Sequence, residues 1–157
     1  WNIDLGSSSA KETIFCKCWL GNSNLVDADI RGADFSGAWI TAADLSNSLL
    51  AGSTLAGATL ARACMKETDL TGTFAVGTDF RSTILNGATM RAANLSGANF
   101  RGASLIDADL SLADLVGADL RGAQLDGAKL NGSRHDGTTR WPETFKPLTS
   151  GGIESHE

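Results

Sequence analysis

The sequence predicts an all-β fold in which the chain winds into a four-sided coil and stacks coil upon coil as a solenoid. Three regularities predict it: a large apolar residue at every fifth position, a small residue two places before it, and glycines gathered two places after it. A period of five matches neither an α-helix, at about 3.6 residues per turn, nor a flat strand, at about two. It fits a chain that turns a corner every five residues, so that four corners close one coil.

The large apolar residues keep one phase over most of the chain. Every fifth residue from Leu20 to Leu130 gives 23 positions, and only Ala75 among them lacks a large apolar side chain. Stepping back two places gives the series from Cys18 to Ala128, in which every residue is Ala, Ser, Thr or Cys. We therefore expect both series to point inward and the residues between them to point outward.

The glycines identify the corners. Thirteen of the 18 glycines stand two residues after the large apolar position. A type II turn needs a positive φ at such a position, and glycine adopts it without a steric penalty. They are Gly32, Gly37, Gly52, Gly57, Gly72, Gly77, Gly87, Gly97, Gly102, Gly117, Gly122, Gly127 and Gly132.

Stacked coils place each residue beneath the residue twenty positions later, at an inter-strand spacing of about 4.8 Å. Buried columns of identical or similar side chains should then run along the rod and form its structural core. One predicted column consists of Leu25, Leu45, Met65, Leu85, Leu105 and Leu125, and Phe80 and Phe100 are neighbours in another. About six such coils make a rod about 28 Å long at that spacing.

One coil departs from the pattern, because its four small positions are all threonine and Ala75 replaces a leucine. The first interpretation is an exchange of volume, in which four β-branched side chains fill the space of the missing leucine. The alternative is a pocket lined by hydroxyl groups. The threonines are Thr68, Thr73, Thr78 and Thr83.

The repeated phrase A-(D/N)-L-x-x resembles that of the pentapeptide-repeat family, and the resemblance covers more than two thirds of the chain. It implies a right-handed quadrilateral parallel β-helix over residues 18–133. The phrase stands here as Ala28-Asp29-Ile30, Ala93-Asn94-Leu95, Ala113-Asp114-Leu115 and Ala118-Asp119-Leu120.

The two ends of the chain are expected to close the solenoid. Residues 1–17 contain Ser9 and Glu12 at the spacing of a capping box, which predicts a short helical cap. Residues 134–147 form a second expected cap, with a helix start at Pro142 and with Trp141 and Phe145 closing the open end. Residues 148–157 are expected to be a flexible tail. The chain begins at Trp1 without a methionine, and we expect it to be a mature or trimmed product.

The W-P-x-x-F-x-P segment of the second cap resembles the C-terminal segments of cyanobacterial and plastid (chloroplast) members of the family. That resemblance favours the thylakoid lumen or the periplasm over the cytoplasm.

The composition argues against an enzyme, a cofactor protein and a metalloprotein. The only histidines, His135 and His156, lie outside the repeats, and no phosphate-binding loop or Ser-His-Asp set is present. Three cysteines make neither a disulfide framework nor a zinc site. No catalytic, cofactor-binding or metal-binding residue is therefore predicted. No apolar run reaches the length of about 18 residues that a membrane span needs.

Most outward positions before the large residue carry Asp, so the exceptions are informative. Trp19 and Trp39 replace it one coil apart on the same face, where we expect the N-terminal segment to cover them. The alternative is that they form a patch that binds a partner. Arg81, Arg101 and Arg121 form a column on consecutive coils beside Asp79, Asn99 and Asp119. They form either a solvated face or a docking stripe for an acidic partner. These five Trp and Arg residues are the candidate partner surface.

Two functions remain. The first is a rigid, non-catalytic scaffold or protein-interaction module, monomeric, whose partner is another protein and neither a nucleic acid nor a membrane. The second is suggested by relatives that imitate duplex DNA and regulate a type II topoisomerase. Mimicry requires a strongly acidic face, whereas residues 20–130 carry 12 acidic and 8 basic side chains spread over all faces. The interaction module is therefore favoured.

Overall fold

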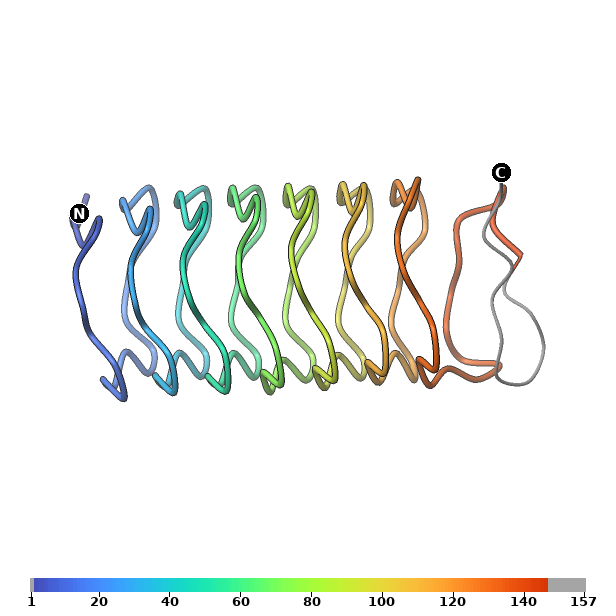
Figure 1. The fold of residues 1–157 in the computed structure, drawn as a ribbon, viewed down its shortest axis with the longest axis horizontal. Coiled ribbons are helices and arrows are strands. Elements are labelled where there is room, and N and C mark those ends of the chain that lie inside the picture. The colour runs from blue at the N-terminus through green and yellow to red at the C-terminus, as the bar shows by residue number, and fades with distance from the viewer. Residues whose placement is uncertain (1, 147–157) are drawn as a thin grey trace.

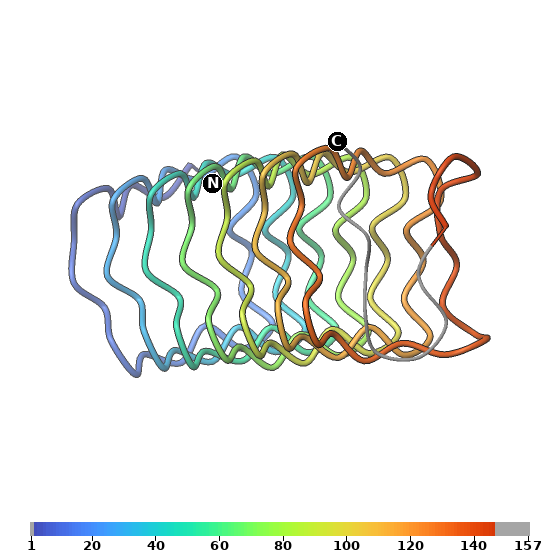
Figure 2. The same cartoon turned by 45° about the vertical axis from the view of Figure 1, so that its right-hand side comes forward.

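The chain forms a four-sided parallel solenoid. Its coils are stacked along one axis (Figure 1), and the bridges show that each coil takes twenty residues. The computed structural model describes residues 2–146. In place of extended strands it has single bridging residues, which recur every five positions from Asp4 to Arg134 and again at Arg140. All the bridges are parallel, and each up to Asp114↔Arg134 joins residues twenty apart. Seen at an angle, the coils keep a nearly constant outline along the rod (Figure 2).

The backbone hydrogen bonds explain why one coil supports the next. The amide of Leu85 donates to the carbonyl of Ser104 over 2.7 Å, and the amide of Ile84 donates to Ala63 on the opposite side over 3.0 Å. Within a corner, the amide of Ala88 donates to the carbonyl of Leu85 over 3.0 Å. Backbone N–H and C=O groups are thus hydrogen-bonded to the coil above, to the coil below and within the coil. Buried backbone groups need such partners, because leaving them unpaired costs free energy.

The corners adopt the predicted conformation. All thirteen glycines two places after the large residue have φ between 63° and 71°. Thirteen other residues occupy the same slot with a positive φ, including Ala92 at 53° and Leu112 at 62°. Glycine is therefore favoured at the corner but is not required there.

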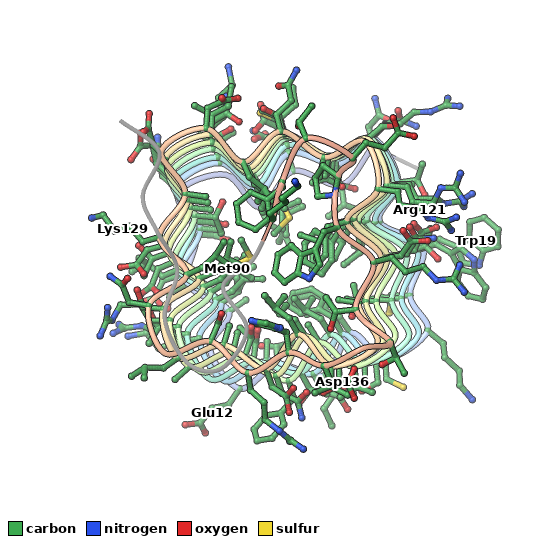
Figure 3. The ribbon with its side chains drawn as sticks, turned by 90° about the vertical axis from the view of Figure 1, so that its right-hand side faces the viewer. Glu12, Trp19, Met90, Arg121, Lys129 and Asp136 are labelled. Carbon is green, nitrogen blue, oxygen red and sulfur yellow. The ribbon has the colours of Figure 1, made fainter. Side chains whose placement is uncertain are left out.

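The core is a stack of columns inside the four walls, visible in the view along the rod, where Met90 points inward (Figure 3). Of the predicted core column, all members are buried except Leu125, which is half-buried near the C-terminal end. Phe80 and Phe100 stack in parallel with ring centroids 4.8 Å apart, the spacing of the coils themselves. Each core side chain is therefore packed between its counterparts in the coils above and below.

The threonine coil is packed and its hydroxyl groups are paired. All four threonines are at most 1 % exposed. Thr68, Thr78 and Thr83 donate to carbonyls of the preceding coil, on Leu45, Leu55 and Leu60, over 2.7–3.0 Å. Thr73 donates to Leu70 in its own coil over 2.9 Å. These bonds support the exchange of volume, because hydroxyls lining a pocket would face a ligand.

The expected N-terminal helix is wrong. Residues 2–17 continue the coil, with bridges from Asp4, Ser9 and Ile14 to the coil that follows and no helix in this part of the chain. Leu5 and Phe15 keep the phase of the large residues, and Phe15 stacks on Phe35 at 4.8 Å. One capping-box spacing cannot repay the cost of helix nucleation where every residue can pair with a neighbouring coil.

The C-terminal end contains a one-residue insertion and, up to residue 146, no helix at Pro142. Asp119 bridges Arg140, twenty-one residues away, so Thr139 takes the small position and Trp141 the large one. Trp141 and Phe145 pack against the core with their ring centroids 5.0 Å apart, and His135 meets Trp141 edge-on at 5.3 Å. The expected tail over residues 148–157 lies outside the described residues.

Candidate partner surface

The outward residues of one wall form the candidate partner surface. The bridging column of this wall consists of Trp19, Trp39, Thr59, Asp79, Asn99, Asp119 and Arg140, and the corner that follows carries Arg81, Arg101 and Arg121. We call this wall the Trp–Arg face. Trp19 and Arg121 point to the same side of the rod (Figure 3), which agrees with the bridges.

The two tryptophans form one exposed aromatic pair. Their ring centroids are 4.7 Å apart with an interplanar angle of 16°, and Trp19 is 66 % exposed and Trp39 40 % exposed. The expectation that the N-terminal segment covers them is wrong for the described residues, because that segment lies in the first coil instead of folding back over this wall. Solvent-exposed indole rings of this kind are typical of binding surfaces.

The outward carboxylates serve the backbone. The side chains of Asp34, Asp44 and Asp109 each accept a hydrogen bond from the backbone amide two residues later, over 2.8–3.0 Å. The asparagines at the equivalent positions, Asn94 and Asn99, accept the same bond. These bonds give the carboxylates a structural role on the surface.

Two of the three arginines in the column are neutralised within their own coils. Arg81 donates to the Asp79 carboxylate from Nε and from one terminal guanidinium nitrogen, and the terminal nitrogen lies 2.7 Å from the carboxylate. Arg121 binds Asp119 in the same way at 2.6 Å. Partial burial raises the pKa of Asp79, but the hydrogen bonds and charge of Arg81 outweigh it and hold that pKa below its ordinary value.

The middle arginine differs from its neighbours. Asn99 stands where the other two coils carry aspartate, so Arg101 has no carboxylate in its own coil. Among residues 2–146, its guanidinium has no hydrogen bond or ion pair, although its backbone amide donates to the Asn99 side chain over 3.1 Å. The hydrogen bond from Arg121, set against partial burial, lowers the pKa of Asp119, and the charge of Arg101 contributes to that shift.

Arg140 and Asn99 were not among the predicted site residues. Arg140 reaches this wall only because one residue is inserted after Arg134, and the five-residue period does not predict that insertion. Asn99 could have been found, because it interrupts the series of aspartates beside the arginine column. The bridging column and the column of Arg81, Arg101 and Arg121 thus carry four arginines against two aspartates, in a chain whose net charge is −5.

Two further observations concern other kinds of site. In the described part of the chain, no three His, Cys, Asp or Glu side chains gather as metal ligands, and no helix is long and apolar enough to cross a membrane. A half-open hollow of about 470 Å³ lies at the C-terminal end, bordered by Arg121, Ala123, Trp141 and Glu143. Among the described residues that line it, the only acidic side chain is Glu143, and none is histidine or cysteine.

Comparisons with known proteins agree with this architecture. The family profile described as pentapeptide repeats (8 copies) matches overlapping stretches that together span residues 13–132. A comparison with curated protein sequences found no significant match.

Several solved structures share the fold. A pentapeptide-repeat protein, Rfr23, from the cyanobacterium Cyanothece 51142 is 26% identical, with a TM-score of 0.53 over 78% of this chain and 90% of that one. QnrB1, a plasmid-mediated fluoroquinolone resistance protein, is 22% identical, with a TM-score of 0.51 over 87% of this chain and 74% of that one. Together with the profile, which covers most of the sequence, the stacked corners and alanine columns show that this chain belongs to the pentapeptide-repeat family.

Proposed function

We propose that this protein is a non-catalytic interaction module that presents the Trp–Arg face to another protein. The observation that carries the proposal is the stacked pair of Trp19 and Trp39, which stay 66 % and 40 % exposed. A rigid wall keeps both rings ordered before binding, so a partner does not bear the entropy cost of ordering them.

The structure also supplies what a scaffold needs. The buried columns and the continuous ladder of backbone bonds fix the wall over its full length, and each outward side chain has a defined place on it. Large aromatic side chains and arginines are the residues most often responsible for binding energy at protein interfaces. Both occur together on this wall.

The experiment compares capture by variants that differ in one exposed aromatic site. Wild-type protein and the double variant Trp19→Ala/Trp39→Ala are immobilised and exposed to extract of the source cells, and bound proteins are quantified by mass spectrometry. Phe74→Ala, which removes a 57 % exposed ring from the neighbouring wall, is the matched control. A partner lost with the tryptophans and retained by the control supports the proposal. Capture that is the same for all three proteins contradicts it.

A DNA-mimicking regulator of a type II topoisomerase is the less favoured function. Mimicry needs unpaired negative charge along a face, whereas the structure pairs Asp29, Asp79 and Asp119 with arginines. We expect no inhibition of gyrase-catalysed DNA supercoiling at micromolar protein. Inhibition at that concentration would favour mimicry over the interaction module.

A further inference from the structure

We infer that the Trp–Arg face binds an extended acidic peptide segment of its partner, with a carboxylate of that segment on Arg101 and an apolar side chain on the tryptophan pair. This inference rests on the proposed function and specifies the chemistry of the partner. Its starting point is the difference among the three arginines of one column.

Within the column of Arg81, Arg101 and Arg121, only the guanidinium of Arg101 has no partner among residues 2–146. Arg81 and Arg121 each hold a carboxylate of their own coil, while Asn99 offers Arg101 only a neutral amide. A guanidinium presents several N–H donors in a planar fork, which a carboxylate can accept in pairs. A carboxylate supplied by a partner would complete at Arg101 the arrangement that the protein completes internally one coil below and one coil above.

The charge of the surroundings favours a short acidic segment over a polyanion. Arg140 adds a second cation to the same wall, in the bridging column next to Asp119. The wall is therefore locally positive although the chain as a whole has a net charge of −5. Nucleic-acid binding depends on the neutralisation of many phosphates, and the negative net charge opposes a long polyanion. One or two carboxylates match what the wall offers.

The geometry also sets the spacing within the partner. Trp39 and Asn99 belong to one bridging column and are three coils apart, which is about 14 Å at about 4.8 Å per coil. An extended peptide advances about 3.3 Å per residue, so the apolar residue and the acidic residue should stand about four positions apart. The segment runs along the rod axis, across the coils, and therefore needs no free backbone edge.

The test uses a fluorescein-labelled peptide of about ten residues in a Gly/Ser background, with one leucine and one glutamate four positions later. Binding is followed by fluorescence anisotropy and by the indole N–H signals of Trp19 and Trp39 in NMR spectra. The same peptide with glutamine in place of glutamate measures the contribution of the carboxylate. A single-stranded DNA oligonucleotide of similar charge measures affinity for phosphates.

The decisive variant is Asn99→Asp, which gives Arg101 the internal partner that Arg81 and Arg121 already have. It should fold normally, because Asp79 and Asp119 hold the same arrangement in adjacent coils. Asn94→Asp is the matched control, since it introduces the same charge at the equivalent position of the neighbouring wall, where Asn94 bonds Ser96.

We expect the glutamate peptide to bind wild-type protein at least fivefold more tightly than the glutamine peptide, with the difference shrinking at high salt. Asn99→Asp should abolish that difference, and Asn94→Asp should preserve it. The inference is overturned if both variants behave alike, if the two peptides bind equally or not at all, or if the oligonucleotide binds more tightly than the peptide. Equal binding of both peptides that is lost in Trp19→Ala/Trp39→Ala would overturn the acidic segment and leave the interaction module supported.

Discussion

Two consecutive coils, residues 66–85 and residues 86–105, build the same shape from different side chains. The first has threonine at all four small positions and Ala75 at a large one, whereas the second has four alanines and Leu95. Outside, the first carries the ion pair of Asp79 and Arg81, and the second carries Asn99 and Arg101, whose guanidinium has no partner among residues 2–146.

The comparison shows which requirements of the coil are strict. The interior must be filled, and the threonine coil fills it by adding methyl groups while it donates its hydroxyls to carbonyls. The exterior is free to vary, because a neutral asparagine accepts the same backbone bond as an aspartate. Selection for a partner can therefore act on the wall without disturbing the core.

The largest effect is expected when the stacked rings of the two coils are removed in turn. Phe80→Ala and Phe100→Ala should each lower the free energy of unfolding by about 3–5 kcal/mol, since each leaves a cavity between packed neighbours. Denaturant unfolding followed by circular dichroism measures both. If the threonine coil is as well packed as the alanine coil, the two losses are similar. A much smaller loss for Phe80→Ala would indicate a loose threonine coil.

Overfilling the threonine coil should have the next largest effect. Ala75→Leu should cost about 1–3 kcal/mol of unfolding free energy, because the threonines already occupy the space that a leucine fills elsewhere. Adding Thr78→Ala should recover part of that loss, so that the double variant is more stable than the sum of the single changes predicts. Strict additivity of the two changes would refute the exchange of volume.

Substituting the corner glycine of each coil should have a smaller effect on stability. Gly77 has φ of 63° with no atom within 4 Å of an added Cβ, while the corresponding position of the next coil is Gly97 at 66°. Replacing either glycine by alanine should cost about 1 kcal/mol through backbone strain alone. Thermal unfolding measures both variants. Ala92, which already has φ of 53°, provides the reverse change, and Ala92→Gly should not destabilise the protein by a comparable amount.

The smallest effect is expected from acid, because it acts on exposed ion pairs. The pKa of Asp79 lies below its unfolded value of 3.8, so this carboxylate stabilises the fold above that pH and the contribution disappears as the pH falls through the lowered pKa. Asp79→Asn should therefore weaken the loss of stability in acid, and Asn99→Asp should strengthen it. Melting temperatures between pH 7 and pH 2 measure the two slopes. Unchanged slopes would mean that these pairs contribute nothing to folding.

The sequence was sufficient to predict the coil, the inward columns and the corners, because the five-residue phase assigns every residue in it to the inside, the outside or a corner. Leu85 and Leu105 are one coil apart, as the bridge between Ile84 and Ser104 shows. The first coil was missed although Leu5 and Phe15 continue the phase. Ala10 stands at the large position between them, and Ser9 and Glu12 suggested a helix.

Two features, the position of Arg140 and the exposure of Trp19, depend on contacts that the five-residue period does not specify. The insertion that brings Arg140 onto the Trp–Arg face is accommodated by a turn in which the amide of Asp136 donates to the hydroxyl of Thr139. The exposure of Trp19 depended on the path of residues 2–17, which could have folded back over it. Both are decided by how distant segments pack, whereas the repeat specifies only how neighbouring coils stack.

Because every wall takes five residues, the length of an insertion or deletion decides how the walls beyond it are aligned with those before it. Losing five residues from the middle would keep every later side chain buried or exposed as before, yet it would turn all the walls beyond that point by a quarter revolution and separate the arginines from the tryptophans. Losing twenty would restore the alignment in a rod shorter by one spacing, about 4.8 Å. A single insertion or deletion can therefore change the length of such a protein and also redistribute its binding groups among the walls. The number of residues gained or lost decides whether the walls stay aligned, as with twenty, or are turned, as with five.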